Sequence, residues 1–205
     1  MKESIILIGG GGHCKSCIDV IEQEGKYRIA GIIDIKEKAG QTLLGYPFIG
    51  TDDDLPLLVG KYKNALITVG QIKSAVLRIK LYNYLKELNA FLPVILSPLA
   101  YLSKHALVEE GSIIMHHALI NAEACIGANN IINSKVLIEH EAILGNHCHV
   151  STSSKINGQV IIGDECFIGS GVTIANNIEI ANKVIIPAGT TVFKSIKKSG
   201  IYIKS

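Results

Sequence analysis

An aliphatic side chain recurs at every sixth residue from Val108 to Val192, without an insertion. The members of this series are Val108, Ile114, Ile120, Ile126, Ile132, Ile138, Leu144, Val150, Ile156, Ile162, Ile168, Ile174, Ile180, Ile186 and Val192. A period of six fits neither an α-helix nor a continuous strand, whose side chains repeat at about 3.6 and about 2 residues. It is typical of a hexapeptide β-helix, in which short flat strands wind into a prism. The repeat therefore predicts the architecture of nearly half the chain.

The slot four residues after each aliphatic residue is also restricted, mostly to small or β-branched side chains such as Ala118, Ala124 and Val136. Two inward positions per hexad suit a narrow tube with a continuous core. Gly or Asn often follows the aliphatic residue directly, as at Asn121 and Gly127, so we expect the corners of the prism there. A β-sandwich would space its strands irregularly, and a helical solenoid would need a much longer period.

The first 105 residues have the pattern of an α/β domain. Short apolar runs predict strands, and apolar residues three or four apart predict helices. The expected strands are 4–9, 27–34, 64–70 and 90–97, and the expected helices are 14–24 and 72–88. This alternation predicts a Rossmann-like parallel sheet. We expect an α/β domain over residues 1–100 and an all-β parallel β-helix over 101–205, with a linker at 98–105.

Composition excludes several classes of function. The formal net charge is +2 and neither half is strongly basic, so we expect no nucleic-acid partner. No apolar stretch is long enough to cross a bilayer, and the first residues lead directly into a strand, so we expect a cytoplasmic protein without membrane insertion. The five cysteines should then be reduced. Cys148 and Cys166 should stack inside the β-helix, whereas the Cys14/Cys17 pair lacks further zinc ligands and should pack on a helix.

The loop Gly9–His13 lies between a predicted strand and a predicted helix. Its backbone N–H groups and the helix N-terminus favour an anion such as a pyrophosphate. Asp34 ends the next strand, about where a ribose-binding acid lies in dinucleotide-binding folds. The full dinucleotide fingerprint is absent, and no dehydrogenase residues are visible. A nucleotide site and a simple glycine-rich turn both fit this loop.

His140 lies in the third slot of its hexad and should point outward, because Ile138 and Ala142 occupy the inward slots. A neutral imidazole is suited to remove a proton near neutral pH, and a carboxylate at Glu139 or Glu141 could orient it. A solvated surface histidine is the alternative. Other histidines occur at 116, 117, 147 and 149, but no close ligand pair on a rigid face is visible, so we expect no metal.

The combination of GGGGH near the N-terminus with IEHEAILGNHCHVS in the repeat resembles the PglD/NeuD-like family of bacterial sugar acyltransferases. The resemblance implies left-handed β-helices assembled as a homotrimer, with acetyl-CoA bound between neighbouring helices and a nucleotide-linked amino sugar on the N-terminal domain. It implies N-acetylation of the 4-amino group of a nucleotide-linked 4-amino-4,6-dideoxy sugar, for polysaccharide or glycan biosynthesis. Another branch of the family acts as sialic-acid-type O-acetyltransferases.

The resemblance also assigns roles by position. His140 matches the general base and Glu141 the acid that increases its basicity. His149 matches a residue near the acetyl-CoA thioester, and Ser170 and Ala188 match coenzyme contacts. The positions that match nucleotide-sugar contacts are Gly11, Gly12, His13, Asp34 and Gly70. A second acid of the family is replaced by Ile35, and the closing G-x-P-A-K motif is missing from the tail.

Two further classes of function compete with the transferase. The β-helix could be a trimeric scaffold whose N-terminal domain only senses a nucleotide, although the His140–Glu141 pair argues against this. A carbonic-anhydrase-like β-helix would use histidines with zinc.

Overall fold

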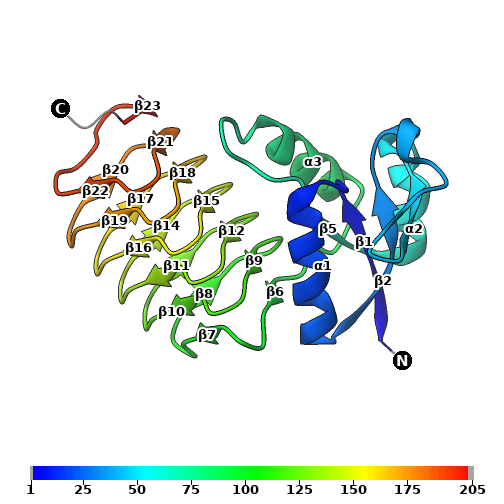
Figure 1. Ribbon diagram of the computed structural model, residues 1–205, viewed down its shortest axis with the longest axis horizontal. Coiled ribbons are helices and arrows are strands. Elements are labelled where there is room, and N and C mark those ends of the chain that lie inside the picture. The colour runs from blue at the N-terminus through cyan, green and yellow to red at the C-terminus, as the bar shows by residue number, and fades with distance from the viewer. Residues whose placement is uncertain (1, 203–205) are drawn as a thin grey trace.

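The computed structural model describes residues 2–202. Its N-terminal region is a five-stranded sheet of order β3-β4-β2-β1-β5, in which only the β3–β4 pair is antiparallel. The elements are β1 Glu3–Ile8, α1 Gly12–Glu24, β2 Tyr27–Ile33, the 3-10 turn Lys36–Lys38, β3 Thr42–Leu43, β4 Tyr46–Gly50, the 3-10 turn Asp52–Asp54, α2 Leu55–Tyr62, β5 Asn64–Ile67 and α3 Val76–Glu87. Figure 1 shows this region beside the long prism formed by the rest of the chain. The expected Rossmann-like arrangement is confirmed.

Helix α1 follows directly from its sequence. Cys14, Cys17, Ile18 and Ile21 recur at helical spacing, and all four are buried. The helix ends at Gly25, whose left-handed backbone (φ 70°) lets its N–H bond to the carbonyl of Ile21. The paired cysteines are thus core residues, more completely buried than the sequence predicts.

Helix α3 begins later than expected. Residues 70–75 form a loop, and Ile72 and Val76 are 64% and 67% exposed. The buried face of α3 consists of Arg78, Leu81 and Leu85. The helix predicted over 72–88 therefore begins four residues later than expected, because the chain before it crosses toward the prism, where Gln71 bonds the carbonyl of His147.

The strand expected over residues 90–97 does not form in the N-terminal sheet. Only an isolated bridge between Asn64 and Phe91 joins that sheet. Pro93 interrupts the run, and Ile95–Leu96 (β6) instead pairs with β9 as the first strand of the prism. Tyr101–Leu102 (β7) follows where a linker was expected. Leu96 and Leu102 share the six-residue phase of Val108, so the repeat already begins there.

The prism consists of three parallel sheets wound by one chain, with hexapeptide repeats as expected for a left-handed β-helix. The first face, called face A, contains β6 Ile95–Leu96, β9 Ile113–Ile114, β12 Ile131–Ile132, β15 His149–Val150, β18 Phe167–Ile168, β21 Val184–Ile186 and β23 Gly200–Ile201. Face B contains β7, β10 Leu119–Ile120, β13 Leu137–Ile138, β16 Lys155–Ile156, β19 Thr173–Ile174 and β22 Thr191–Val192. Face C contains β8 Leu107–Val108, β11 Cys125–Ile126, β14 Ile143–Leu144, β17 Ile161–Ile162 and β20 Glu179–Ile180.

The core of the prism is the predicted aliphatic series. Leu119 pairs with Leu137 and Ile120 with Ile138, so one coil spans three hexads. Ile120, Ile138 and Ile156 are almost completely buried, as are the small residues at the second inward slot. Cys148 and Cys166 lie on adjacent coils inside this core, which confirms the expected stacking.

The corners of the prism lie two residues later than expected. Left-handed backbone recurs at every sixth residue three positions after the aliphatic one, for example at His117, Asn129 and Glu141. The glycines directly after the aliphatic residue have another purpose. A Cβ at Gly145 would come within 2.4 Å of Asp164 Oδ1 and 2.8 Å of backbone atoms on the next coil. Glycine is thus required there for close approach of coils and not for positive φ.

The N-terminal region packs against face A. The outward side chains Ile95, Ile113 and Ile131 of that face are fully buried in one cluster with Leu7 and Ile18. Contacts between α1 and β6 lie at this junction (Figure 1). No helix among residues 2–202 is long and apolar enough to cross a membrane.

Candidate active site

His140 and Glu141 form a hydrogen-bonded pair at the corner between faces B and C. His140 Nδ1 lies 2.9 Å from Glu141 Oε2, and both side chains are about half exposed (54% and 44%). Glu141 has left-handed backbone (φ 59°), which turns its side chain back beside the preceding imidazole. Gln159, one coil farther on, donates from Nε2 to both carboxylate oxygens at 3.2 Å. The hydrogen bonds from His140 and then Gln159 lower the pKa of Glu141.

Glu139, the other candidate partner, is engaged elsewhere. Its Oε2 accepts from Asn121 Nδ2 at 2.9 Å on the preceding coil. Because a carboxylate accepts, the Nδ1 of His140 carries a proton toward Glu141 and its Nε2 keeps a lone pair in the neutral ring.

Gly158 makes room for the His140 ring. A Cβ at this position would come within 2.8 Å of both Cε1 and Nε2 of the imidazole. Gly158 and Gln159 lie eighteen residues after His140 and Glu141. The sequence did not identify either residue as part of a site, although the coil period would have pointed to them.

His149 lies on face A, beneath the N-terminal region, and is only 8% exposed. Its Nδ1 donates to the carbonyl of Gln71 at 2.6 Å, and Phe167 packs edge-on against the ring at 5.2 Å. His13, the last residue of the glycine loop motif, lies with its ring centroid 6.4 Å from that of His149. The fold thus brings His13, which the resemblance assigns to the nucleotide sugar, close to His149, which it assigns to acetyl-CoA.

Burial and a neighbouring cation keep both histidines neutral. Burial, followed by the charges of Arg78 and His149, lowers the pKa of His13 to about 3. Burial, together with the Arg78 charge, lowers the pKa of His149 to about 4, against the opposing effect of the Gln71 bond. Arg78 itself is 1% exposed and bonds the carbonyls of Ile67 and Val69.

The glycine loop carries open backbone at the start of α1. Gly11 is the N-cap of the helix, and Cβ atoms at Gly11 and Gly12 would meet nothing within 4 Å. Such a helix start can receive an anion between its N–H groups. Gly70, in the loop after β5, lies beside the glycine loop, since a Cβ there would lie 3.6 Å from His13 Cβ.

Asp34 lies at the carboxyl edge of the same sheet. Its carboxylate accepts from Gly10 N at 2.5 Å, Lys38 Nζ at 2.7 Å and Ile35 N at 2.7 Å. Burial works to raise the pKa of Asp34, but these hydrogen bonds outweigh it and lower the pKa. The residue predicted to bind a ribose therefore also fixes the glycine loop.

A cavity of about 550 Å³ opens beside Asp34. Ile8 and Ile33 at the ends of β1 and β2 form its floor, and Ile35 and Leu77 lie at its rim. Ligands of open parallel sheets bind at this carboxyl edge. The position of the cavity at this edge, beside Asp34, therefore fits the predicted nucleotide site.

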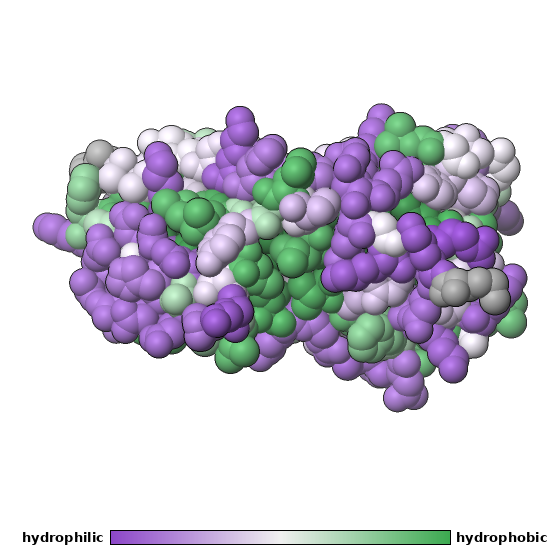
Figure 2. Space-filling model, turned by 90° about the horizontal axis from the view of Figure 1, so that it is seen from below, coloured by the Kyte–Doolittle hydropathy of each residue, from purple (hydrophilic) through white to green (hydrophobic). Residues whose placement is uncertain are grey.

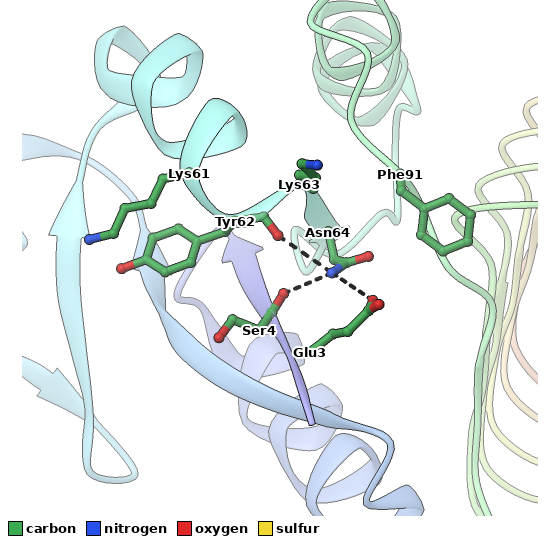
Figure 3. A pocket seen from close by; sticks show the side chains of 7 residues that line it. All are labelled: Glu3, Ser4, Lys61, Tyr62, Lys63, Asn64 and Phe91. Carbon is green, nitrogen blue, oxygen red and sulfur yellow. Dashed lines mark hydrogen bonds between the residues drawn. The ribbon is translucent and has the colours of Figure 1, made fainter. Parts of the chain in front are cut away.

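A larger hollow of about 660 Å³ lies at the opposite edge of the sheet. Figure 3 shows its lining, with Asn64 Nδ2 bonded to Glu3, Ser4 and Tyr62. It contains none of the predicted site residues and lies at the amino ends of β1 and β5. Its size alone therefore does not make it the active site.

Ser170 and Ala188 lie on successive coils at the corner between faces A and B. Both are exposed, and Ser170 Oγ lies 2.8 Å from Ser151 Oγ. This corner is not the one that carries His140. Among the described residues, no group of three or more His, Cys, Asp or Glu side chains could hold a metal ion.

The glycine loop and the His140–Glu141 pair of one chain lie at different parts of the prism. The hydrogen bonds between the two regions reach face A or its two corners, as at Asn129, His147 and His116. His140 lies at the third corner, which face A does not share. The glycine loop and the His140–Glu141 pair of the same chain thus face different sides of the prism.

Comparisons with known proteins agree with the two-part fold. Residues 4–85 match the PglD N-terminal domain, and residues 141–176 and 159–194 match the bacterial transferase hexapeptide repeat. A search of curated proteins gave no match. PerB from Caulobacter crescentus, solved in complex with CoA and GDP-perosamine, is 29% identical with a TM-score of 0.89, over 97% of this chain and 92% of that chain.

Two further solved structures are similar. A variant of the GDP-perosamine N-acetyltransferase from Caulobacter crescentus, also with CoA and GDP-perosamine, is 27% identical with a TM-score of 0.90, over 97% of this chain and 92% of that one. The acetyltransferase domain of PglB from Neisseria gonorrhoeae is 24% identical with a TM-score of 0.89, over 98% and 96% of the two chains, which supports the fold.

Proposed function

We propose that this chain, which belongs to the PglD/NeuD-like family of hexapeptide-repeat sugar acyltransferases, transfers the acetyl group of acetyl-CoA to the amino group of a nucleotide-linked amino sugar. The finer proposal is the 4-amino group of a 4-amino-4,6-dideoxy sugar, in cytoplasmic synthesis of a polysaccharide or glycan precursor. The single observation that carries the proposal is the His140–Glu141 pair at 2.9 Å on an open corner of the prism. Similar structures hold CoA and GDP-perosamine, which supports both substrates.

The reaction proceeds by direct transfer. The neutral sugar amine attacks the thioester carbonyl, and Nε2 of His140 takes the proton that the amine loses. Collapse of the tetrahedral intermediate breaks the carbon–sulfur bond, and the coenzyme leaves as the thiol with the proton that His140 returns. Glu141 holds the ring in the tautomer with Nε2 unprotonated and stabilises its charged form. Direct attack of the amine requires no acyl-enzyme, and Cys148 and Cys166 are buried inside the coils, where they are poorly placed as nucleophiles.

The acceptor would lie on the N-terminal region. The open backbone at Gly11 and Gly12 suits the diphosphate, and the cavity beside Asp34 suits the nucleoside. His13 and Gly70 lie next to each other beside this loop and would contact the sugar. Ser170 and Ala188 would contact the coenzyme along the outer corner of the coils.

A homotrimer would complete the site. Since His140 and the glycine loop of one chain face different sides, the loop must meet the His140 of a neighbouring copy. Outward side chains of face C form an apolar row, with Leu107, Ile143 and Ile161 exposed at 67%, 45% and 43%. Figure 2 shows hydrophobic surface over the first coils of the prism, next to the N-terminal region. Such a surface favours association of copies.

The direct test is thiol release from acetyl-CoA with a panel of GDP-, UDP- and dTDP-linked 4-amino sugars. We expect turnover with at least one member, and His140→Ala should lower kcat by about 10²- to 10⁴-fold without loss of fold. Full activity of the variant would contradict the role of His140. Absence of transfer to every sugar would favour a non-catalytic scaffold instead.

A further inference from the structure

The two ring nitrogens of His149 have partners of opposite kind. Nδ1 lies 2.6 Å from the carbonyl oxygen of Gln71, which can only accept a hydrogen bond. Nε2 lies 3.4 Å from Nδ2 of Asn133, a weak contact on the neighbouring coil. The proton of the neutral ring therefore lies on Nδ1, and Nε2 keeps its lone pair.

The orientation of Asn133 is fixed independently of His149. Its Oδ1 accepts the backbone N–H of Ser134 at 2.7 Å, so its NH₂ group must be the one directed toward the imidazole. A charged His149 would place an N–H donor against this amide donor. Both neighbours thus favour the same neutral tautomer.

Gln71 owes its position to its side chain. Its Nε2 donates to the carbonyl of His147 at 2.9 Å, across the junction between the two regions, and the residue is 2% exposed. On the other side of Gly70, Arg78 holds the carbonyl of Val69 at 2.7 Å. The backbone of Gln71 is therefore held between the N-terminal sheet and the prism, with its carbonyl directed at His149.

We propose that Gln71 is a positioning residue for acetyl transfer, which fixes His149 as the Nδ1–H tautomer and so presents Nε2 as a hydrogen-bond acceptor for an N–H or O–H group of a bound substrate. The proposal rests on the proposed function, since it concerns the same site. It gives the two histidines separate tasks: His140 moves the proton, and His149 only accepts a hydrogen bond.

The charges around His149 support this division. Burial and the guanidinium of Arg78 hold the pKa of His149 near 4, and the titratable groups that face it are His13 and Arg78. The pKa of His13 and that of His147 are lowered as well, mainly by burial. A ring that stays neutral at pH 7 is a dependable acceptor and a poor base.

The tautomer can be read directly from the ¹⁵N spectrum of histidine-labelled protein without substrates. We expect His149 to have a protonated Nδ1 and an unprotonated Nε2. Gln71→Met keeps the length of the side chain but removes its donor, so part of the population should move to the Nε2–H form, and kcat/KM should fall about 10- to 100-fold. Gln41→Met is the matched control, because Gln41 also donates to a backbone carbonyl, that of Glu37 at 2.9 Å, on an exposed surface. Gln41→Met should change neither the tautomer of His149 nor kcat/KM.

The donor to Nε2 has two possible sources, a pantetheine amide of the coenzyme or a group of the amino sugar. Titration with coenzyme A alone and with the accepted nucleotide sugar alone separates them, because only the true donor shifts the Nε2 resonance. A protonated Nε2 in the wild-type protein would overturn the proposal, whether or not the variant folds. An unchanged tautomer in Gln71→Met, or an Nε2 resonance that neither substrate shifts, would overturn it as well. Since the tautomer is read without turnover, these outcomes are distinct from failure of thiol release.

Discussion

The imidazole of His140 lies directly against Gly158 of the next coil, where a Cβ would come within 2.8 Å of the ring atoms Cε1 and Nε2. The contact involves the very nitrogen that we assign to proton transfer. The absence of a side chain at Gly158 therefore determines where that nitrogen lies.

Gly158→Ala should displace the ring and lower kcat by about 10- to 100-fold, because small misplacements of reacting groups are costly. Gly60→Ala in α2 is the control, since its Cβ would meet nothing within 4 Å. When His140 is already replaced by Ala, Gly158→Ala should lower kcat hardly any further. Additive losses in this double-mutant cycle would mean that Gly158 acts through something other than His140.

Glu141→Gln should lower kcat by about 10- to 10³-fold while leaving KM nearly unchanged. A glutamine amide can donate to Nδ1 and so favour the wrong tautomer of His140. Glu139→Gln is the matched control, because Glu139 bonds Asn121 and not His140. Steady-state kinetics of the two variants separate these roles, and equal losses would contradict the assignment of Glu141.

Stability should fall as the pH drops from about 6.5 to about 5. The pKa values of His13 and His149 are lowered from 6.5 to about 3 and about 4. Between about pH 6.5 and 5, the unfolded chain therefore binds protons at these histidines and the folded chain does not. The two neutral histidines make their full contribution to the free energy of unfolding above the unfolded pKa of 6.5. Below it this contribution declines, by on the order of 1–2 kcal/mol for each histidine at pH 5. Urea unfolding between pH 7.5 and 5 measures this slope. His149→Gln should make it shallower, and a flat profile for the wild type would disagree with two buried neutral histidines.

Ile143→Glu should dissociate the assembly, because it introduces a charge into the apolar row on face C. Light scattering after size exclusion should give a trimer for the wild type and smaller species for the variant. Leu57→Glu is the control, since Leu57 is 76% exposed on α2, away from this row. A trimer that survives Ile143→Glu would place the interface on another face.

The sequence predicted most where the pattern is local and repeated. The inward series through Ile120 and Ile138 determines the prism, because each slot repeats the same environment. The prediction placed the corners of the prism wrongly, because Gly127 and Gly145 suggest positive φ. Glycine is needed at these two positions because the next coil approaches them closely. Glu141 shows that an ordinary residue can occupy the left-handed corner when the coil geometry imposes it.

The contacts between the two regions could not be predicted. Gln71 has no motif around it, and its role depends on His147 and His149, more than seventy residues away. Arg78 carries no signal in the sequence that marks it as a core residue, yet it is buried and bonds Asn129 of the prism. Such pairs depend on how two units dock, and no local periodicity encodes that.

The central claim is that one copy supplies His140 and another supplies the glycine loop. It is tested most directly by mixing two inactive variants, His140→Ala and Gly11→Glu, unfolding and refolding them together, and measuring thiol release. Gly11→Glu adds a negative charge in open space at the anion site. Mixed trimers should recover about a quarter of the wild-type rate, because a quarter of the interfaces then pair an intact His140 with an intact loop. A mixture as inactive as its two components would contradict a site shared between copies.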